Sequence, residues 1–327
     1  MTRVRLAGIP LEVSPLCLGG VPFGAPLDDA ATFALLDRFV ALGGNFIDTA
    51  RMYSDWLPGE KGRSERVLGD WLRARGIRER LVVATKGMHP DLATVHVPRS
   101  SAAEIRSDLE ASLRTLRLET IDLYWLHRDD PARPVEHFVD VLNAFAREGK
   151  VRAFGFSNWT AERLRAAHDY ARRSGQQTLT ASQPFWCLGC RQAKEPGFTG
   201  WVKMDAAVHA FHVESGVAVI PYTAQAKGFF TKAQLSPEKQ PRDFAAHEFN
   251  TPANQALARA VGEMARARGV TANAVVLAYL WTRPFPVVPI IGASRPAQLD
   301  DNFAAAGFRL SAEELRALEA ASNSGLE

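Results

Sequence analysis

Cysteine is scarce in this sequence, which has 3 in 327 residues. An odd, small number in a long chain excludes a disulfide-stapled scaffold and indicates a reducing compartment. An excess of one charge is also missing, since 39 Lys and Arg stand against 36 Asp and Glu. Without a basic block, we expect no nucleic-acid partner.

Long uninterrupted hydrophobic runs are missing too. The most apolar stretch, 272–293, is broken by Arg283 and three prolines, and falls short of the ~20 apolar residues that a membrane span needs. The first fifteen residues hold two arginines but no apolar core typical of a secretory signal. We expect a soluble, cytoplasmic protein with no membrane partner.

Short apolar segments recur along the chain with helical patterns between them. They begin near Leu16, Asn45, Leu81, Ile121, Val151, Thr180, Val217 and Val287. The first six intervals, of 29 to 40 residues, each fit one strand, one helix and two loops. Eight such units predict an α/β fold, a (β/α)8 TIM barrel with an N-terminal β-hairpin, formed as a single domain by residues 1–327.

The last interval, of 70 residues, holds something extra. Thr251, followed by proline, is an N-cap, and Gly269 is a natural C′ residue, so they bound one inserted helix. A second helix is expected over 271–282, and residues 227–250 are expected to form a long polar loop. A further capped helix begins at Ser311 and closes the chain.

Ionisable side chains follow three adjacent predicted strands. Asp48 ends the second strand, Tyr53 lies in the loop after it, Lys86 ends the third and His127 ends the fourth. Each alone also fits a structural role, such as a cap or a surface position. Barrel enzymes carry their chemistry at these strand ends, and an unpaired buried ammonium is costly, so together they predict an active site.

These four groups are suited to proton transfer. The Lys86 ammonium would stabilise the phenolate of Tyr53 and lower its pKa from about 10. Asp48 would keep Lys86 charged, and His127 would bind and polarise a substrate oxygen. A carbonyl that takes a proton on oxygen then requires a hydride on carbon.

The motifs around these residues resemble the aldo-keto reductase family. NFIDTAxxY contains Asp48 and Tyr53, ATKG contains Lys86, IDLYWLHRDD contains His127, and GFSN, SQPFW, IPYT and IIGASRPAQLDDN follow. The resemblance implies an NADP-dependent enzyme that reversibly reduces an aldehyde or ketone to the alcohol. In such enzymes Tyr is the general acid, Lys and Asp tune it, and His orients the carbonyl.

The cofactor, NADP(H), is also implied by the resemblance, because no G-x-G-x-x-G opens a helix. The resemblance assigns the nicotinamide to Ser157, Asn158, Gln183 and Tyr222. From the residues alone, Ser157 and Asn158 also fit a turn before a helix.

The choice of NADPH over NADH rests on the last motif. Ser294 and Arg295 precede a predicted helix, where N–H groups and a guanidinium favour a 2′-phosphate. From the sequence alone, Arg295 is equally an ordinary surface charge. The rest of the implied cofactor set is Gly228, Gly292, Gln298, Asp301 (where Glu is more usual) and Asn302.

Loops at the same rim of the barrel are expected to form the substrate pocket. Its aromatic candidates are Trp56, Trp159 and Trp186, within loops that include residues 87–98, 185–201 and 227–250. The segment 87–99 and the HRDD stretch resemble members that act on sugar-like or other secondary carbonyls.

No metal site is predicted. Cys187 and Cys190 form a single C-x-x-C, too little for zinc, and are expected to line the substrate pocket. His209 and His212 are spaced to share a helix face, which we expect to be solvated.

A second interpretation is a cofactor-sensing regulatory subunit with the same fold and little turnover, because some members of the family are associated with channels. The complete set of four residues disfavours it. A metal-dependent hydrolase would need an H-x-H at an early strand end, which the sequence lacks.

Overall fold

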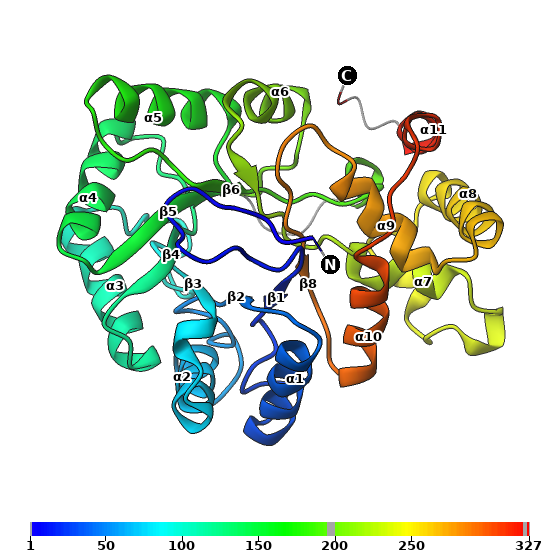
Figure 1. Cartoon of the computed structure of the whole chain (residues 1–327), viewed down its shortest axis with the longest axis horizontal. Helices are drawn as coiled ribbons and strands as arrows, with labels where there is room; N and C mark the ends of the chain where they lie inside the picture. Colours follow the sequence, from blue (N-terminus) through cyan, green and yellow to red (C-terminus); the bar gives the residue numbers. More distant parts are fainter. Residues whose placement is uncertain (1, 195–199, 323–325, 327) are drawn as a thin grey trace.

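The computed structural model describes residues 2–194, 200–322 and 326. Within these residues, eight parallel strands form one curled sheet in the order β7-β6-β5-β4-β3-β2-β1-β8 (Figure 1). The strands are β1 (Cys17–Gly19), β2 (Phe46–Asp48), β3 (Val82–Gly87), β4 (Ile121–Leu126), β5 (Val151–Ser157), β6 (Ala181–Gln183), β7 (Ala218–Val219) and β8 (Ile290–Ile291).

The barrel closes between β7 and the segment before β8. Val219 N donates to Pro286 O at 2.9 Å, and Val288 N donates to Val219 O at 2.9 Å. The last strand was expected from Val287, but its regular part begins at Ile290. The cause is proline, because Pro286 and Pro289 have no N–H to donate to a ladder. The predicted (β/α)8 barrel is confirmed.

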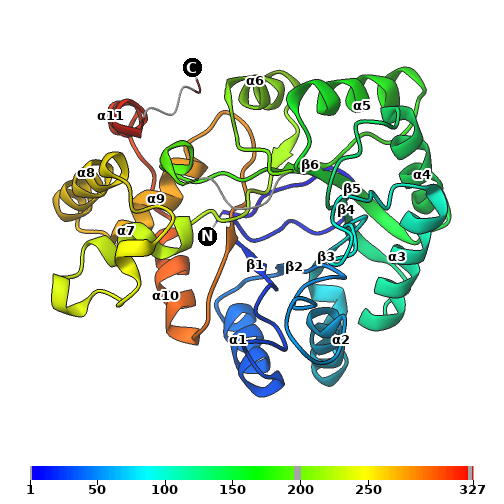
Figure 2. The same ribbon diagram turned by 180° about the vertical axis from the view of Figure 1, so that it is seen from behind.

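Helices surround the sheet on its outer face (Figure 2). They are α1 (Asp29–Ala41), α2 (Arg63–Arg75), α3 (Ala102–Leu116), α4 (Val135–Arg147), α5 (Ala161–Arg173), α6 (Ala206–Ser215), α7 (Phe229–Ala233), α8 (Pro252–Arg268), α9 (Ala272–Trp281), α10 (Pro296–Ala305) and α11 (Ala312–Ser322). None of the helices in the described residues is long and apolar enough to cross a membrane.

The inserted helix is α8, and its predicted ends are confirmed. The Thr251 side chain accepts a hydrogen bond from Asn254 N, and Gly269 ends the helix with φ of 61°. The terminal helix α11 packs beside α8. Both additions lie outside the ring that covers the strands (Figure 1).

The long polar loop predicted for residues 227–250 is wrong. The segment contains α7 and short 3-10 turns at Pro237–Lys239 and Phe244–Ala246. Its phenylalanines are buried, and the rings of Phe229 and Phe244 stack with centroids 5.5 Å apart. Burying these rings stabilises compact local structure that the polar composition of the segment conceals.

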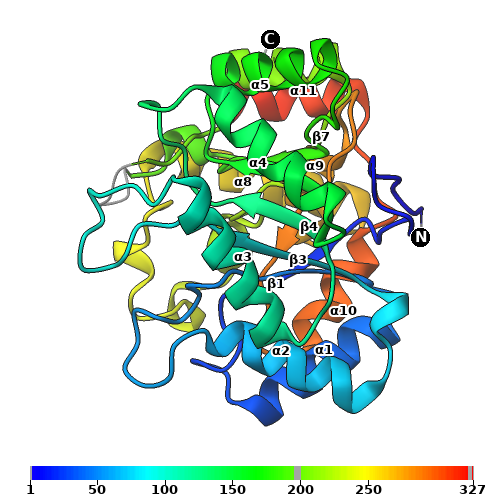
Figure 3. The same ribbon diagram turned by 90° about the vertical axis from the view of Figure 1, so that its left-hand side faces the viewer.

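A hairpin plug, residues 4–13, seals one end of the barrel. Val4 N donates to Val13 O at 2.9 Å and Val13 N donates to Val4 O at 2.8 Å, which confirms the predicted N-terminal hairpin. Leu6, Ile9 and Val13 are buried with apolar residues of the barrel interior. Figure 3 shows this plug at the opposite end from the long loops that follow β2 and β3. Chemistry is therefore confined to the loop end.

Gly155 tests the packing inside the barrel. A Cβ on this residue would lie 2.4 Å from Ala181 O and 2.4 Å from Trp125 Cζ3. We expect Gly155→Ala to lower the free energy of unfolding by about 1–3 kcal/mol, because neither the β6 backbone nor the Trp125 ring can move freely. Urea unfolding measures this.

The matched control is Gly307→Ala, since nothing lies within 4 Å of a Cβ there. Equal unfolding midpoints for the two variants would contradict the tight packing of β5 against β4 and β6.

Candidate active site

Lys86 joins two other members of the predicted group. Its Nζ donates to the Asp48 carboxylate, to Thr49 O at 2.9 Å and to the Tyr53 hydroxyl at 2.9 Å. Lys86 and Asp48 are each 1% exposed. The ammonium has three protons and three acceptors, so this buried charge is fully hydrogen-bonded.

Burial and pairing act on the two charges in opposite senses. Burial alone would lower the pKa of Lys86, but Asp48 and Tyr53 raise it above its ordinary value. Burial raises the pKa of the Asp48 carboxyl, against the attraction of Lys86. We assign Lys86 and Asp48 as charged. Asp48 also accepts a hydrogen bond from Gln183 Nε2 at 3.2 Å, and each of the three Lys86 ammonium protons has an acceptor.

Tyr53 differs from the expectation in one respect. Burial raises the pKa of its phenol, and Lys86 offsets this rise only in part. The net pKa is thus raised, although the effect of Lys86 has the expected downward direction. The consequence is a tyrosine that stays protonated at neutral pH, which is the state a proton donor requires.

His127 lies beside this group at the end of β4. Its ring is edge-on to Tyr53, with centroids 5.9 Å apart, and to His89 at 4.9 Å. Desolvation, followed by the charges of His89 and Lys86, lowers the pKa of His127 well below its usual range. The imidazole is thus neutral, and its buried Nδ1 has no hydrogen-bond partner among the described residues.

Helix α2 supports the strands that carry Asp48 and Lys86. The hydroxyls of Ser64 and Thr49 are 2.7 Å apart, and Ser64 also donates to Gly20 O at 2.7 Å. Glu65 accepts a hydrogen bond from Thr85 Oγ1 at 2.6 Å. The sequence analysis did not single out Ser64 or Glu65. They could have been recognised as two polar residues on the same buried helix face as Val67 and Leu68.

The four residues assigned to the nicotinamide form one hydrogen-bonded group next to His127. Ser157 Oγ donates to Gln183 O at 3.0 Å, and Asn158 Nδ2 donates to His127 O at 3.3 Å. The Tyr222 hydroxyl donates to Asn158 Oδ1 at 2.7 Å. Asn158 has a left-handed φ of 62°, a conformation that Asn tolerates better than most residues.

The residues assigned to the adenosine end meet at the start of α10. Ser294 N and Arg295 N donate to Gln298 Oε1 at 2.7 and 3.1 Å. Arg295 is exposed. The backbone N–H groups of this helix start and the guanidinium are the donors that a phosphate needs.

Asn273 links the remaining adenosine candidates. Its Nδ2 donates to Asp301 Oδ2 and to Asn302 Oδ1, both at 2.8 Å. Gln225 bridges them to Gly292, whose N donates to Gln225 Oε1 at 3.1 Å. Asn302 Nδ2 is buried without a partner among the described residues. This unpaired buried donor therefore lies on α10, the helix that begins after Arg295. Gly228 begins α7 nearby in sequence, with φ of 76°.

Two of the three expected pocket tryptophans are in the core instead. Trp159 stacks on Phe156 with centroids 4.0 Å apart, and Trp186 packs edge-on against Tyr279 at 6.2 Å. Both are almost fully buried, so neither is exposed at the expected substrate pocket. Trp56 is 48% exposed and lies edge-on to Tyr53, with centroids 6.4 Å apart. Residues 195–199 of the expected pocket loop lie outside the described residues.

The predicted surroundings of Cys187, Cys190 and His212 are also wrong. Cys187 and Cys190 are buried beside Trp186, at a cavity of ≈10 Å³, so they do not face the expected pocket. His212 is buried and bonded through its ring nitrogens to Ser182 Oγ and Val217 O, both at 2.7 Å, so its helix face is not solvated. No group of potential metal ligands occurs among the described residues.

The geometry agrees with a comparison to known families. A model described as the Aldo/keto reductase family matches residues 15–323. The chain belongs to the aldo/keto reductase family. It is accordingly an oxidoreductase.

Relatives within the aldo/keto reductases align over almost the whole chain. A norsolorinic acid reductase of Emericella nidulans is 33% identical over 327 residues, covering 96% of this chain and 79% of that protein. An aryl-alcohol dehydrogenase of Pestalotiopsis microspora is 28% identical, covering 97% of this chain and 81% of that protein. A crystal structure of a thermostable aldo-keto reductase with the inhibitor epalrestat shares the fold, with a TM-score of 0.73, 22% identity, and coverage of 98% of this chain and 100% of that one.

Glu65 gives the site a measurable pH dependence. Burial raises its pKa from 4.5 to about 7. Because the folded protein keeps the proton while the unfolded chain loses it, the free energy of unfolding falls as pH rises from 4.5 to about 7. Glu65→Gln has no carboxyl to titrate. Between pH 4.5 and about 7, we therefore expect its free energy of unfolding to rise by about 3 kcal/mol relative to that of wild type.

Urea unfolding at a series of pH values measures the difference. Glu79→Gln, at an exposed position, is the control. If the difference in free energy of unfolding between Glu65→Gln and wild type stayed constant over this pH range, the raised pKa of Glu65 would be contradicted.

Proposed function

We propose that this chain is an NADPH-dependent carbonyl reductase that converts an aldehyde or ketone into the alcohol. The observation that carries the proposal is the contact of the Tyr53 hydroxyl with Lys86 Nζ, at 2.9 Å, beside the ring of His127. A proton donor, a cation that stabilises its conjugate base and a neutral hydrogen-bonding group are the parts that protonation of a carbonyl oxygen requires.

The side chains divide the work on the substrate oxygen. His127 hydrogen-bonds the carbonyl oxygen and orients it toward Tyr53. The Tyr53 hydroxyl donates its proton to that oxygen, and the nearby Lys86 ammonium stabilises the phenolate that remains. Asp48 holds Lys86 in place and charged. When bound, the nicotinamide cofactor supplies the hydride to the carbonyl carbon, and the reverse proton transfer makes Tyr53 the base in alcohol oxidation.

Cofactor binding is proposed at two clusters. Ser157, Asn158, Gln183 and Tyr222 would hold the nicotinamide end, beside His127. The start of α10, with Arg295, would hold the 2′-phosphate, which an NADH molecule lacks. The names of the reductase and dehydrogenase relatives support carbonyl and alcohol chemistry. A cytoplasmic location and the sugar-like substrate class remain predictions.

Replacement of Tyr53 tests the reaction. Tyr53→Phe removes the proton donor without changing the size of the ring, so we expect kcat for carbonyl reduction to fall by at least about 100-fold. NADPH affinity, measured by fluorescence titration, should stay close to that of wild type. Tyr170→Phe, a change to a surface tyrosine bonded to Asp140, is the control.

Near-normal turnover by Tyr53→Phe would overturn the assignment. The regulatory-subunit alternative gives a different result, namely tight NADPH binding by the wild-type protein without reduction of any carbonyl in a broad panel.

Replacement of Arg295 tests the choice of cofactor. A charge-assisted hydrogen bond is worth about 1.5–3 kcal/mol, so we expect Arg295→Ala to raise KM for NADPH about tenfold or more. KM for NADH should change little, because NADH has no 2′-phosphate. Arg73→Ala, at an exposed position on α2, is the control. Equal effects on both cofactors would contradict a phosphate contact.

A further inference from the structure

Arg128 presents a positive charge beside His127 that no carboxylate in the described part of the chain neutralises. It follows His127, and its half-buried guanidinium interacts electrostatically with Tyr53, Tyr222 and His89. Its Nη1 donates to Gly200 O at 2.8 Å, and its Cζ lies 5.8 Å from the centre of the Trp201 ring. No carboxylate of the described residues forms an ion pair with it.

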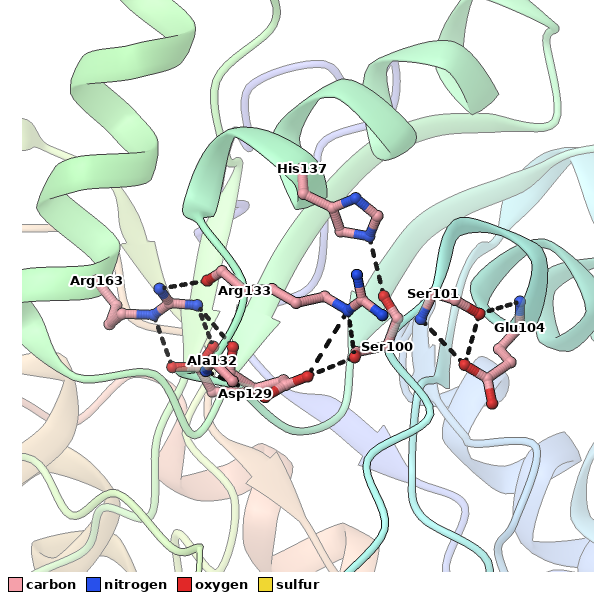
Figure 4. Close-up of polar contacts among 9 residues, drawn as sticks. Ser100, Ser101, Glu104, Asp129, Ala132, Arg133, His137 and Arg163 are labelled. Atoms are coloured by element: carbon pink, nitrogen blue, oxygen red, sulfur yellow. Dashed lines mark hydrogen bonds and ion pairs between the residues drawn. The ribbon is translucent and has the colours of Figure 1, made fainter.

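The loop that carries Arg128 is held firmly by its other charged residues. Asp129 accepts hydrogen bonds from Arg163 Nε at 2.9 Å and Nη2 at 2.7 Å. Asp130 accepts from Ala132 N at 3.2 Å and from Ser100 Oγ. Figure 4 shows this network, which joins the loops after β3 and β4 to the start of α5. The two acidic residues that follow Arg128 are therefore engaged by other partners.

Backbone contacts fix Arg128 itself. Trp159 Nε1 donates to Arg128 O at 3.4 Å, and Asn158 Nδ2 donates to the preceding carbonyl, His127 O, at 3.3 Å. The contacts with Gly200 O and the Trp201 ring hold the guanidinium as well, so it loses little freedom when a ligand binds. Partial burial without a counter-ion also costs free energy, which a bound anion would recover.

We propose that Arg128 binds an anionic group of the substrate, so that the enzyme selects aromatic aldehydes or ketones that carry a carboxylate near the reacting carbonyl. A guanidinium has the planar fork that matches a carboxylate. The Trp201 ring lies beside the Arg128 guanidinium, and Trp56 lies edge-on to Tyr53, so aromatic rings near both groups favour a flat substrate body. This inference rests on the proposed carbonyl reduction.

A matched pair of substrates tests the proposal. 3-Carboxybenzaldehyde and its methyl ester differ in charge and little in shape. We expect wild type to favour the carboxylate, and the ratio of kcat/KM for acid over ester to fall about tenfold or more in Arg128→Gln, mainly through KM. Arg128→Lys, which keeps the charge but not the fork, should give an intermediate ratio. Arg147→Gln, at an exposed position at the end of α4, should keep the wild-type ratio.

Cofactor phosphate is the other source of an anion for Arg128, and a binding measurement separates the two. We expect the Kd for NADPH to be similar in wild type and Arg128→Gln. A weakened NADPH affinity with an unchanged acid-to-ester ratio would overturn the proposal. So would an unchanged ratio alone.

Two further measurements test the proposal without relying on a folded variant or on turnover, respectively. In wild type, rising ionic strength should lower the acid-to-ester ratio, and a flat ratio would contradict an exposed charge contact. If wild type reduces neither aldehyde, the proposed function fails, and calorimetry with benzoate still decides the anion site. Benzoate binding that is weakened in Arg128→Gln supports the site, and unchanged or absent binding overturns it.

Discussion

The buried ion pair between Lys86 and Asp48 is the constraint on which the rest of this molecule depends. Two charges that are removed from water are tolerated only when every proton and lone pair finds a partner. The partners come from β2, from β6 through Gln183 and from the loop that carries Tyr53. Strand register, barrel closure and the position of Tyr53 must therefore be correct together.

The barrel was predictable because parallel strands that are buried on both faces appear in the sequence as short apolar runs at regular spacing. Two regions did not follow that rule. Near β8, prolines remove backbone donors, so the strand begins later than its apolar run. Residues 227–250 are mostly polar, and this composition did not indicate that their phenylalanines are buried or that α7 packs against α8 and α9.

The four catalytic candidates were predictable because strand ends of one barrel converge at one rim. The tryptophans were not, because the side that a loop residue turns toward depends on packing between elements distant in sequence. Trp159 turns toward Phe156 and Trp186 toward Tyr279, and neither neighbour is indicated by local sequence. Arg128 lay within a recognised motif, but only the three-dimensional structure shows that no carboxylate among the described residues pairs with it.

The hairpin plug also limits the routes by which Tyr53 would recover its proton in the proposed reaction. Beneath the ion pair, the barrel interior holds apolar side chains such as Phe46, Val82 and Leu123, down to Leu6 and Ile9 of the plug. A proton relay needs a continuous run of hydrogen-bonding groups, and among the described side chains of this column only the Cys17 thiol and the Trp125 indole offer one. In the proposed reduction, water would therefore reach the Tyr53 phenolate from the loop end of the barrel, where the substrate would also enter. Reprotonation and product release would then share one passage, so slow release of the alcohol would also delay reprotonation of Tyr53.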